Sequence, residues 1–334
     1  MYSARSLIFK DKGVIMKTVK LGKTNIEVSE VGFGVLTMGK SQMNLPVSEG
    51  SSLIEYAIER GINFFDTAEY YETYNYMAKP FSKTNKDLVL STKSYAETKE
   101  DMFNAVEQAR KALNRDVIDI FMMHEVRGMN DFNNRVSAYD ELMRLKALGI
   151  IKAIGVSTHH VDMAEAAASM DYVDIVFPLI NFKGLGIRKG NVFGTADEMA
   201  CAIRKCSDAG KGLYAMKAFG GGNLTGYYQQ ALDYVYGLPG IECVMLGFGK
   251  KKEIDDICDY LDGKMSKDYV PDISKKRIHI DQGDCEGCGA CMRKCPNGAI
   301  FWDPENGLAR VNPDKCLTCG YCAPVCPVRA IIMY

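Results

Sequence analysis

The residues best suited to chemistry are cysteines, and most of them lie near the C-terminus. Eight of the twelve cysteines fall within the last 50 residues, in two copies of the spacing C-x2-C-x2-C-x3-C followed by proline. This spacing is typical of cysteines that hold [4Fe–4S] clusters, each bound by four thiolates. The C-terminal segment therefore predicts two clusters that carry electrons one at a time. The candidate ligands are Cys285, Cys288, Cys291 and Cys295 in the first copy and Cys316, Cys319, Cys322 and Cys326 in the second.

The two copies are also alike around their cysteines. Every cysteine of the second copy lies 31 residues after its counterpart, and the flanking residues 296–300 and 327–331 share proline, alanine and isoleucine. Such a repeat indicates an internal duplication. Structural zinc also uses Cys-x2-Cys pairs, but it needs four ligands from two such pairs. Disulfides need an oxidising compartment. The spacing favours clusters over both alternatives.

The segment from about residue 275 to residue 334 resembles the bacterial two-cluster ferredoxin. In that family the fourth cysteine of each run binds the other cluster. The resemblance implies a crossed arrangement, in which each cluster takes three ligands from one copy and one from the other. Cluster one would use Cys285, Cys288, Cys291 and Cys326, and cluster two would use Cys316, Cys319, Cys322 and Cys295.

A second group of reactive side chains lies in the first half of the chain, at or just after successive predicted strands. Asp66, Lys93 and His124 each end or follow one of these strands, and Tyr71 comes five residues after Asp66. A lysine cation beside a tyrosine lowers the tyrosine pKa, because it favours the phenolate. A carboxylate would hold the lysine, and a histidine could orient a carbonyl oxygen. The four residues predict a general acid for carbonyl reduction.

Strands and helices alternate through the segment that must position these residues. Short apolar runs rich in β-branched residues predict eight strands at 31–35, 62–66, 87–92, 118–123, 152–156, 173–177, 212–216 and 242–246. Periodic apolar positions predict helices at 48–60, 100–113, 136–148, 160–169, 196–209 and 250–262.

This strict alternation predicts an α/β fold with a parallel sheet. Eight units within residues 16–265 fit a closed (β/α)8 TIM barrel, whose usual length is about 250 residues. A doubly wound open sheet would need a glycine-rich turn between its first strand and first helix, and Gly32-x-Gly34 leads into no clear helix. Residues 17–30 predict a hairpin ahead of the barrel that closes its bottom.

The segment from about Val19 to Leu261 resembles the aldo-keto reductase family. The motifs that carry the resemblance are KLGKTNIEVSEVGFG, FFDTAEYY, LSTKSY, DIFMMHE, AIGVS and MKAFGGGNLTG. The resemblance implies that Tyr71 is the general acid, that Asp66 and Lys93 tune it, and that His124 positions the substrate. It also implies a small-molecule carbonyl or alcohol substrate and NADPH as cofactor.

The chain departs from the family pattern where the nicotinamide would bind. The family usually has glycine after the catalytic tyrosine, and here the residue is Glu72. The family's Ser-Asn pair is Ser157-Thr158, and the positions of its glutamine and its stacking tyrosine are Phe177 and Met216. Asn181 is a candidate to compensate for these replacements.

Two further segments are candidates for the phosphate groups of NADPH. Gly220, Gly221 and Gly222 could bring backbone amides to a pyrophosphate, or form only a flexible loop that opens a helix. Lys250, Lys251 and Lys252 begin a predicted helix, where cations oppose the helix dipole and an anion would offset them. The alternative is a solvated charge run.

Composition limits the class of protein. Hydrophobic residues make up 47% of the chain, charged residues 25%, and the net charge is −1, so neither nucleic acid nor a membrane surface is an expected partner. Clusters and free thiols indicate a reducing compartment, so a cytoplasmic protein is expected. We predict an extension at 1–15, the barrel at 16–265, a linker at 266–283 and the ferredoxin-like domain at 284–334. Apolar linker residues such as Val270, Ile273, Ile278 and Ile280 predict that this domain packs on the barrel.

Two functions remain open from the sequence alone. In the first, the chain is an NAD(P)H-dependent oxidoreductase that reduces a carbonyl or oxidises an alcohol, and the clusters transfer electrons. In the second, the barrel is a non-catalytic docking platform, and the chain carries electrons for a redox partner protein. A hydride moves two electrons together and a cluster moves one, so the coupling between the two parts is not evident from the residues.

Overall fold

A computed structural model describes residues 16–273, 276–318 and 320–334 of the chain. The predicted extension at 1–15 and the predicted ligand Cys319 lie outside these residues. Within them, an eight-stranded parallel sheet runs through the first 246 residues in the order β11-β8-β7-β6-β5-β4-β3-β12. Its strands are β3 (Val31–Gly34), β4 (Phe64–Asp66), β5 (Val89–Ser94), β6 (Ile118–Met123), β7 (Ile151–Thr158), β8 (Ile175–Pro178), β11 (Gly212–Leu213) and β12 (Val244–Leu246).

Backbone pairing also joins the two ends of this sheet. Ala215, just beyond β11, forms a parallel bridge with Val244. The amide of Ala215 donates to the Cys243 carbonyl at 3.0 Å, and the amide of Met245 donates to the Ala215 carbonyl at 2.8 Å. The predicted (β/α)8 barrel is thus confirmed, and each of the eight predicted strands overlaps an observed one.

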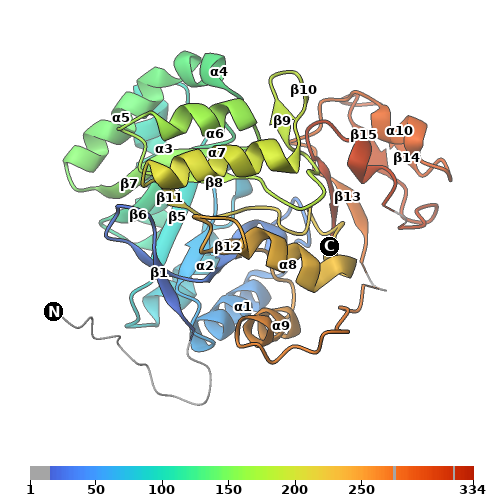
Figure 1. The fold of residues 1–334 in the computed structure, drawn as a ribbon, viewed down its shortest axis with the longest axis horizontal. Helices are drawn as coiled ribbons and strands as arrows, with labels where there is room; N and C mark the ends of the chain where they lie inside the picture. Colours follow the sequence, from blue (N-terminus) through green and yellow to red (C-terminus); the bar gives the residue numbers. More distant parts are fainter. Residues whose placement is uncertain (1–15, 274–275, 319) are drawn as a thin grey trace.

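Helices follow the strands and cover the outside of the sheet (Figure 1). Six match the predicted ranges: α1 (Val47–Glu59), α3 (Lys99–Leu113), α5 (Val136–Ala147), α6 (Val161–Ala168), α7 (Ala196–Asp208) and α9 (Lys251–Leu261). Three were not predicted: α2 (Tyr74–Ser82), α4 (Met129–Asn134) and α8 (Tyr228–Tyr236). Helix α2 contains Pro80, and proline within a segment usually argues against a helix. None of the helices in the described residues is long and apolar enough to span a membrane.

Helix α3 shows how local sequence sets these boundaries. The Thr98 hydroxyl accepts the Asp101 amide at 3.1 Å, which caps the first turn. Acidic residues occupy the first turn and basic residues the last, as the helix dipole favours. Asn114 then adopts a left-handed conformation, with φ of 50°, and ends the helix.

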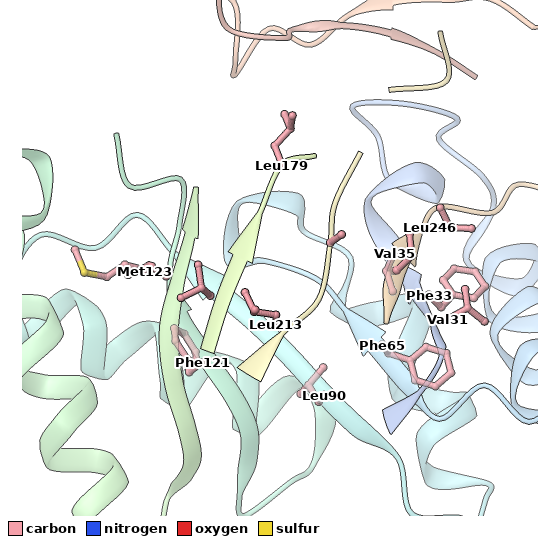
Figure 2. Close-up of a cluster of buried hydrophobic side chains, with 14 of the residues drawn as sticks. Val31, Phe33, Val35, Phe65, Leu90, Phe121, Met123, Leu179, Leu213 and Leu246 are labelled. Carbon is pink, nitrogen blue, oxygen red and sulfur yellow. The ribbon is translucent and has the colours of Figure 1, made fainter. Parts of the chain in front are cut away.

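The barrel has two apolar layers. Side chains such as Phe33, Phe65 and Phe121 point outward from the strands toward the helices (Figure 2). The alternate residues, including Phe64, Met122 and Tyr214, fill the interior. A hairpin of β1 (Thr18–Lys20) and β2 (Glu27–Ser29) adds Leu21, Ile26 and Val28 to this interior layer. The predicted hairpin is therefore present, and it closes the end of the barrel opposite the candidate active site.

The C-terminal segment folds around its own small core. Two short antiparallel sheets form it, β13 (Ile278–Ile280) with β16 (Ile331–Met333) and β14 (Ile300–Trp302) with β15 (Ala309–Val311), together with α10 (Ala290–Lys294). Strand β13 lies inside the predicted linker 266–283, so the folded tail begins before residue 284. We call residues 278–334 the tail.

The tail lies against the barrel, on the side of the hairpin of β9 (Arg188–Lys189) and β10 (Val192–Phe193) (Figure 1). The apolar residues from which this contact was predicted do not form it. Val270 and Ile273 are exposed, and Ile278 and Ile280 are buried within the tail itself. Docking depends instead on the strand β16 and on residues 281–286, which approach loops of the barrel.

Candidate active site and cluster-binding sites

The four residues predicted for catalysis lie together at the carboxyl ends of the strands. The Lys93 ammonium donates to Asp66 Oδ1 and to the Thr67 carbonyl, both at 2.6 Å. The Tyr71 hydroxyl lies 3.2 Å from His124 Nε2. Lys93 Nζ is 5.3 Å from the centre of the Tyr71 ring, so the two pairs are neighbours. Tyr71 belongs to a 3₁₀ turn, Glu69–Tyr71, that follows β4.

Burial governs the protonation of this group. Desolvation, followed by the charge of Asp66, raises the pKa of Tyr71 well above its usual value. The sequence predicted the opposite direction, because Lys93 was expected to favour the phenolate; in the structure Lys93 is committed to Asp66, and nearby carboxylates outweigh it. Burial lowers the pKa of His124 well below its usual value, with Lys93 and Arg135 adding to the effect. At neutral pH the pair is a protonated phenol and a neutral imidazole.

Asp66 and Lys93 form a buried ion pair beneath the phenol. Burial raises the pKa of Asp66 and lowers that of Lys93, and each partner opposes the shift of the other. Below the pair, the Tyr214 hydroxyl donates to Asp66 Oδ2 at 3.3 Å, and its ring stacks on Phe177 at 4.0 Å. Phe177 is thus part of the barrel interior, and it offers no polar group to a ligand.

Several residues at the mouth of the barrel, the end where the carboxyl ends of the strands lie, were not predicted. Tyr95 stacks on the His124 ring at 4.3 Å, and its hydroxyl donates to Glu125 Oε2 at 2.8 Å. His159 is buried, with its Nδ1 3.9 Å from Glu125 Oε1. Tyr95 and His159 directly follow β5 and β7, so the same strand-end signal that identified His124 could have identified them.

Strained backbone marks the same region. Glu72, Glu125 and Lys217 have φ values of 53°, 47° and 58°. Residues other than glycine rarely adopt this left-handed backbone conformation, and such residues cluster at functional sites. Glu72 occupies the position where the resembling family has glycine, and its φ explains why glycine suits that position.

The polar groups predicted for the nicotinamide are paired within the protein. Ser157 Oγ accepts the Glu125 amide at 2.8 Å, and Thr158 Oγ1 donates to the Val126 carbonyl at 2.6 Å. Asn181 is fully buried and exchanges two hydrogen bonds with the backbone of Leu185, at 3.0 and 2.9 Å. These residues hold the loops of the mouth in place.

The predicted phosphate loop lies under the tail. The Met333 amide donates to the Gly221 carbonyl at 2.7 Å, and Asn223 Nδ2 reaches the Ile331 carbonyl at 3.4 Å. A Cβ atom at Gly222 would collide with the Met333 carbonyl oxygen. Strand β16 therefore covers Gly221 and Gly222, and Arg329 of the tail lies beside Gly220.

The three lysines begin α9 as predicted, but they have local partners. Lys250 is the N-cap residue, Lys251 lies 4.8 Å from the Tyr56 ring, and Lys252 pairs with Asp256 at 2.7 Å. The Glu253 carboxylate accepts a hydrogen bond from the Gly249 amide at 2.8 Å. An acidic side chain therefore already supplies negative charge at the start of this helix.

Residues 281–286 of the tail lie at the mouth of the barrel. Glu286 pairs with Arg127 at 3.2 Å, and Asp284 approaches Lys217 at 4.0 Å. A Cβ atom at Gly283 would collide with the Tyr70 hydroxyl, one residue before Tyr71. The predicted cluster ligand Cys285 thus belongs to a segment that packs against the 3₁₀ turn that contains Tyr71.

The described cysteines of the tail fall into two sets. Burial raises the pKa of Cys291 to about 11, and the thiols of Cys326, Cys285 and Cys288 add to this shift. Cys295, Cys316 and Cys322 instead line one cavity between the two halves of the tail. Each set matches one predicted cluster, with Cys319 outside the described residues.

Backbone amides also suit bound clusters. Burial alone would raise the pKa of Cys295, but amides of the loop 297–300 donate to its sulfur and lower the pKa below its usual value. Amides of Val328, Ala330 and Ile331 surround the Cys326 sulfur in the same way. Amide donors stabilise thiolates and tune cluster potentials, so the residues present fit [4Fe–4S] clusters.

Comparison with known proteins assigns both parts. Residues 30–239 match the profile of the aldo/keto reductase family. The chain belongs to this family. Residues 284–330 match a 4Fe-4S dicluster domain. The family assignment agrees with the barrel and with the position of its four polar residues.

Individual relatives cover only parts of the chain. An uncharacterised oxidoreductase of Bacillus subtilis, YqkF, is 26% identical over 158 residues, or 43% of this chain and 49% of that protein. A ferredoxin of Pyrobaculum islandicum is 46% identical over 56 residues, or 17% of this chain and 51% of that protein. The chain thus spans about half of the length of these relatives.

Solved structures share the fold of the barrel. An aldo-keto reductase of Bacillus halodurans in its holo form aligns with a TM-score of 0.60 at 17% identity, covering 77% of this chain and 99% of that one. At this identity the likeness shows the fold alone.

Proposed function

We propose that the chain is an iron–sulfur oxidoreductase of aldo-keto reductase type, which reduces a small-molecule carbonyl or oxidises the corresponding alcohol at Tyr71. The observation that carries the proposal is the contact between the Tyr71 hydroxyl and His124 Nε2 at 3.2 Å, above the buried Lys93–Asp66 pair. The same mouth is bordered by the tail segment that contains Cys285.

Each residue has a definite task in this proposal. The raised pKa of Tyr71, caused by burial and Asp66, keeps the hydroxyl protonated, so that it can donate a proton to a carbonyl oxygen. His124 is neutral because burial lowers its pKa, and it directs that oxygen toward the hydroxyl. The Lys93 cation, 5.3 Å from the Tyr71 ring, stabilises the phenolate left after proton transfer. Asp66 holds Lys93 in position.

The tail supplies the second half of the proposal. Two [4Fe–4S] clusters would be held by the eight cysteines in the crossed arrangement, and when bound they would exchange single electrons with a redox partner protein. Carbonyl reduction needs two electrons and two protons. The clusters, when bound, would pass the two electrons singly, Tyr71 would give one proton to the carbonyl oxygen, and solvent would supply the proton that ends on the carbon.

The sequence predicted NADPH as the electron donor, and the proposal departs from that prediction. The residues present do not fit it while the tail is docked, because β16 covers Gly221 and Gly222 and because Ser157, Thr158 and Asn181 have internal partners. The proposal therefore includes no step that uses NADPH.

The direct test is turnover by the Tyr71→Phe variant on a panel of aldehydes, ketones and quinones, with anaerobic protein reduced by a one-electron dye. Loss of the proton donor should lower kcat by about 10²- to 10⁴-fold. Tyr76→Phe is a matched control, because its hydroxyl donates to the Leu45 carbonyl away from the site. Equal rates for wild type and Tyr71→Phe would reject the assigned role of Tyr71.

The second candidate function is an electron-transfer protein whose barrel is a docking platform. The internal pairing of Ser157, Thr158 and Asn181 favours it, because these groups are not open to a cofactor. In that case electron exchange with protein partners would continue unchanged in Tyr71→Phe, and no carbonyl compound of the panel would be consumed by the wild type.

A further inference from the structure

Arg329 is a buried cation between the tail and the barrel. Its side chain is fully inaccessible, and it is the largest such side chain in the described residues. Only Nη1 has a hydrogen-bond acceptor, the Ala323 carbonyl at 3.1 Å, while Nε and Nη2 are buried without any partner. A buried charge without a counter-ion is strongly destabilising. The arrangement therefore favours an anion that contacts the two unpaired nitrogens.

The repeat shows that this arginine is not required by the local fold. Arg329 lies three residues after Cys326, and the equivalent residue in the first copy, three after Cys295, is Gly298. Both adopt the left-handed conformation, with φ of 62° and 59°. Residues other than glycine adopt this conformation only at a cost in free energy. The second copy thus carries an arginine where the first copy uses the residue that the backbone favours.

The barrel makes room for this side chain. A Cβ atom at Gly186, whose φ is 84°, would lie 2.6 Å from Arg329 Cδ, and a Cβ atom at Gly220 would lie 3.3 Å from Arg329 Nη2. The guanidinium is therefore enclosed by the loops that contain Gly186 and Gly220. Enclosure removes water from around the charge, which strengthens its interaction with any nearby anion.

The backbone places Arg329 beside the predicted cluster ligands. Arg329 follows Cys326, which belongs to the set that would hold cluster one, by three residues. Its Nη1 donates to the carbonyl of Ala323, the residue directly after Cys322. The described residues include no carboxylate paired with Arg329.

We propose that Arg329 is a positioning and tuning residue for cluster one, and that its unpaired Nε and Nη2 donate to the sulfur atoms of that cluster. The inference rests on the proposed function only in requiring that the clusters are bound. A buried cation stabilises the more negative, reduced form of a cluster, so Arg329 raises the reduction potential of cluster one. Cluster two has Gly298 at the equivalent position and lacks this cation. The two otherwise similar clusters should therefore differ in reduction potential.

The test is a redox titration of the anaerobic full-length chain, followed by the electron paramagnetic resonance signals of the reduced clusters. We expect two potentials in the wild type. Arg329→Gln should lower the higher one by at least a tenfold change in the reduction equilibrium, or 59 mV for one electron, and leave the other unchanged. In the Arg329→Lys variant this potential should lie between those of the wild type and of Arg329→Gln. Arg310→Gln is the matched control, because Arg310 is a half-exposed tail residue paired with Asp303.

Unchanged potentials in an Arg329→Gln protein that keeps its iron would overturn the proposal. If that variant loses a cluster, wild-type protein labelled with ¹⁵N-arginine decides. A guanidinium nitrogen coupled to the reduced cluster supports the contact, and the absence of such coupling rejects it. A wild-type chain that binds no iron–sulfur cluster would instead defeat the proposed function, which is a distinguishable result.

Discussion

The mouth of the barrel has two halves that differ in how their polar groups are used. In the half that contains Tyr71, the proposed catalytic half, Tyr71 and His124 contact each other, and His124 Nδ1 is buried without a partner. In the half where family members are expected to hold a nicotinamide cofactor, Ser157, Thr158 and Asn181 are paired internally, and the tail covers Gly221. The two halves thus differ in pairing: the proposed proton-transfer residues contact each other and leave His124 Nδ1 unpaired, whereas the polar groups of the other half are bound within the protein or covered by the tail.

The largest expected effect comes from removing a cluster ligand. Cys291→Ser should remove about four of the roughly eight iron atoms per chain and destabilise the tail, whose core includes Cys291, Cys322 and Cys326. The barrel, with its separate core, should stay folded. Trp302 is the single tryptophan and lies in the tail, so its fluorescence follows the tail while far-ultraviolet circular dichroism follows the barrel. Full iron content in this variant would contradict the ligand assignment.

Breaking the buried ion pair of the catalytic half should destabilise the barrel. Lys93→Met leaves Asp66 buried without its cation, which should lower the free energy of unfolding by about 3–5 kcal/mol. Anaerobic urea unfolding measures this loss. The double variant Asp66→Asn with Lys93→Met removes both charges and should recover most of the stability. A single variant as stable as wild type would show that the pair is open to water.

Weakening the contact between the tail and the barrel tests the second half of the mouth, which the tail covers. Gly222→Ala adds a Cβ atom that collides with the Met333 carbonyl, at a φ of 84° that alanine avoids. A penalty of about 1–2 kcal/mol should make limited proteolysis between residues 264 and 284 roughly tenfold faster. Gly226→Ala is the control in the same loop, because nothing lies within 4 Å of its added Cβ. Equal cleavage of the two variants would argue against docking through β16.

The smallest expected effect concerns His159 and pH. Burial, followed by the charge of Lys217, lowers the pKa of His159 well below its usual value. In the unfolded chain His159 binds a proton below about pH 6.5, whereas the folded chain resists it, so stability falls as pH falls through that value. His159→Gln should reduce the pH slope by up to about 1.4 kcal/mol per unit between pH 7 and pH 5. Urea unfolding across that range measures the slope, and an unchanged slope would contradict the burial of His159.

The fold was largely predictable because its signals are local. Parallel strands buried on both faces appear as short continuous apolar runs, and all eight were found. Asp66, Lys93 and His124 were found because strand ends meet at one face of a barrel. Helix α2 was missed because Pro80 interrupts its pattern.

The remaining features depend on contacts between distant segments. The direction of the Tyr71 pKa shift was wrong because burial and carboxylates, including Asp284 of the tail, outweigh Lys93. The partners of Asn181 and the cover over Gly221 depend on loop and tail geometry that no sequence window contains. Arg329 carries a signal in the sequence, because the duplication pairs it with Gly298, but its burial is visible only in the structure.

The most direct test of the account is anaerobic titration of the full-length chain with NADPH and, separately, with a one-electron dye, while cluster and nicotinamide absorbance are followed. With the tail docked, the account predicts that NADPH neither binds nor reduces the clusters. It predicts that the dye reduces both clusters and then supports carbonyl reduction that depends on Tyr71. Stoichiometric oxidation of NADPH, with the segment between residues 264 and 284 still protected from proteolysis, would contradict it.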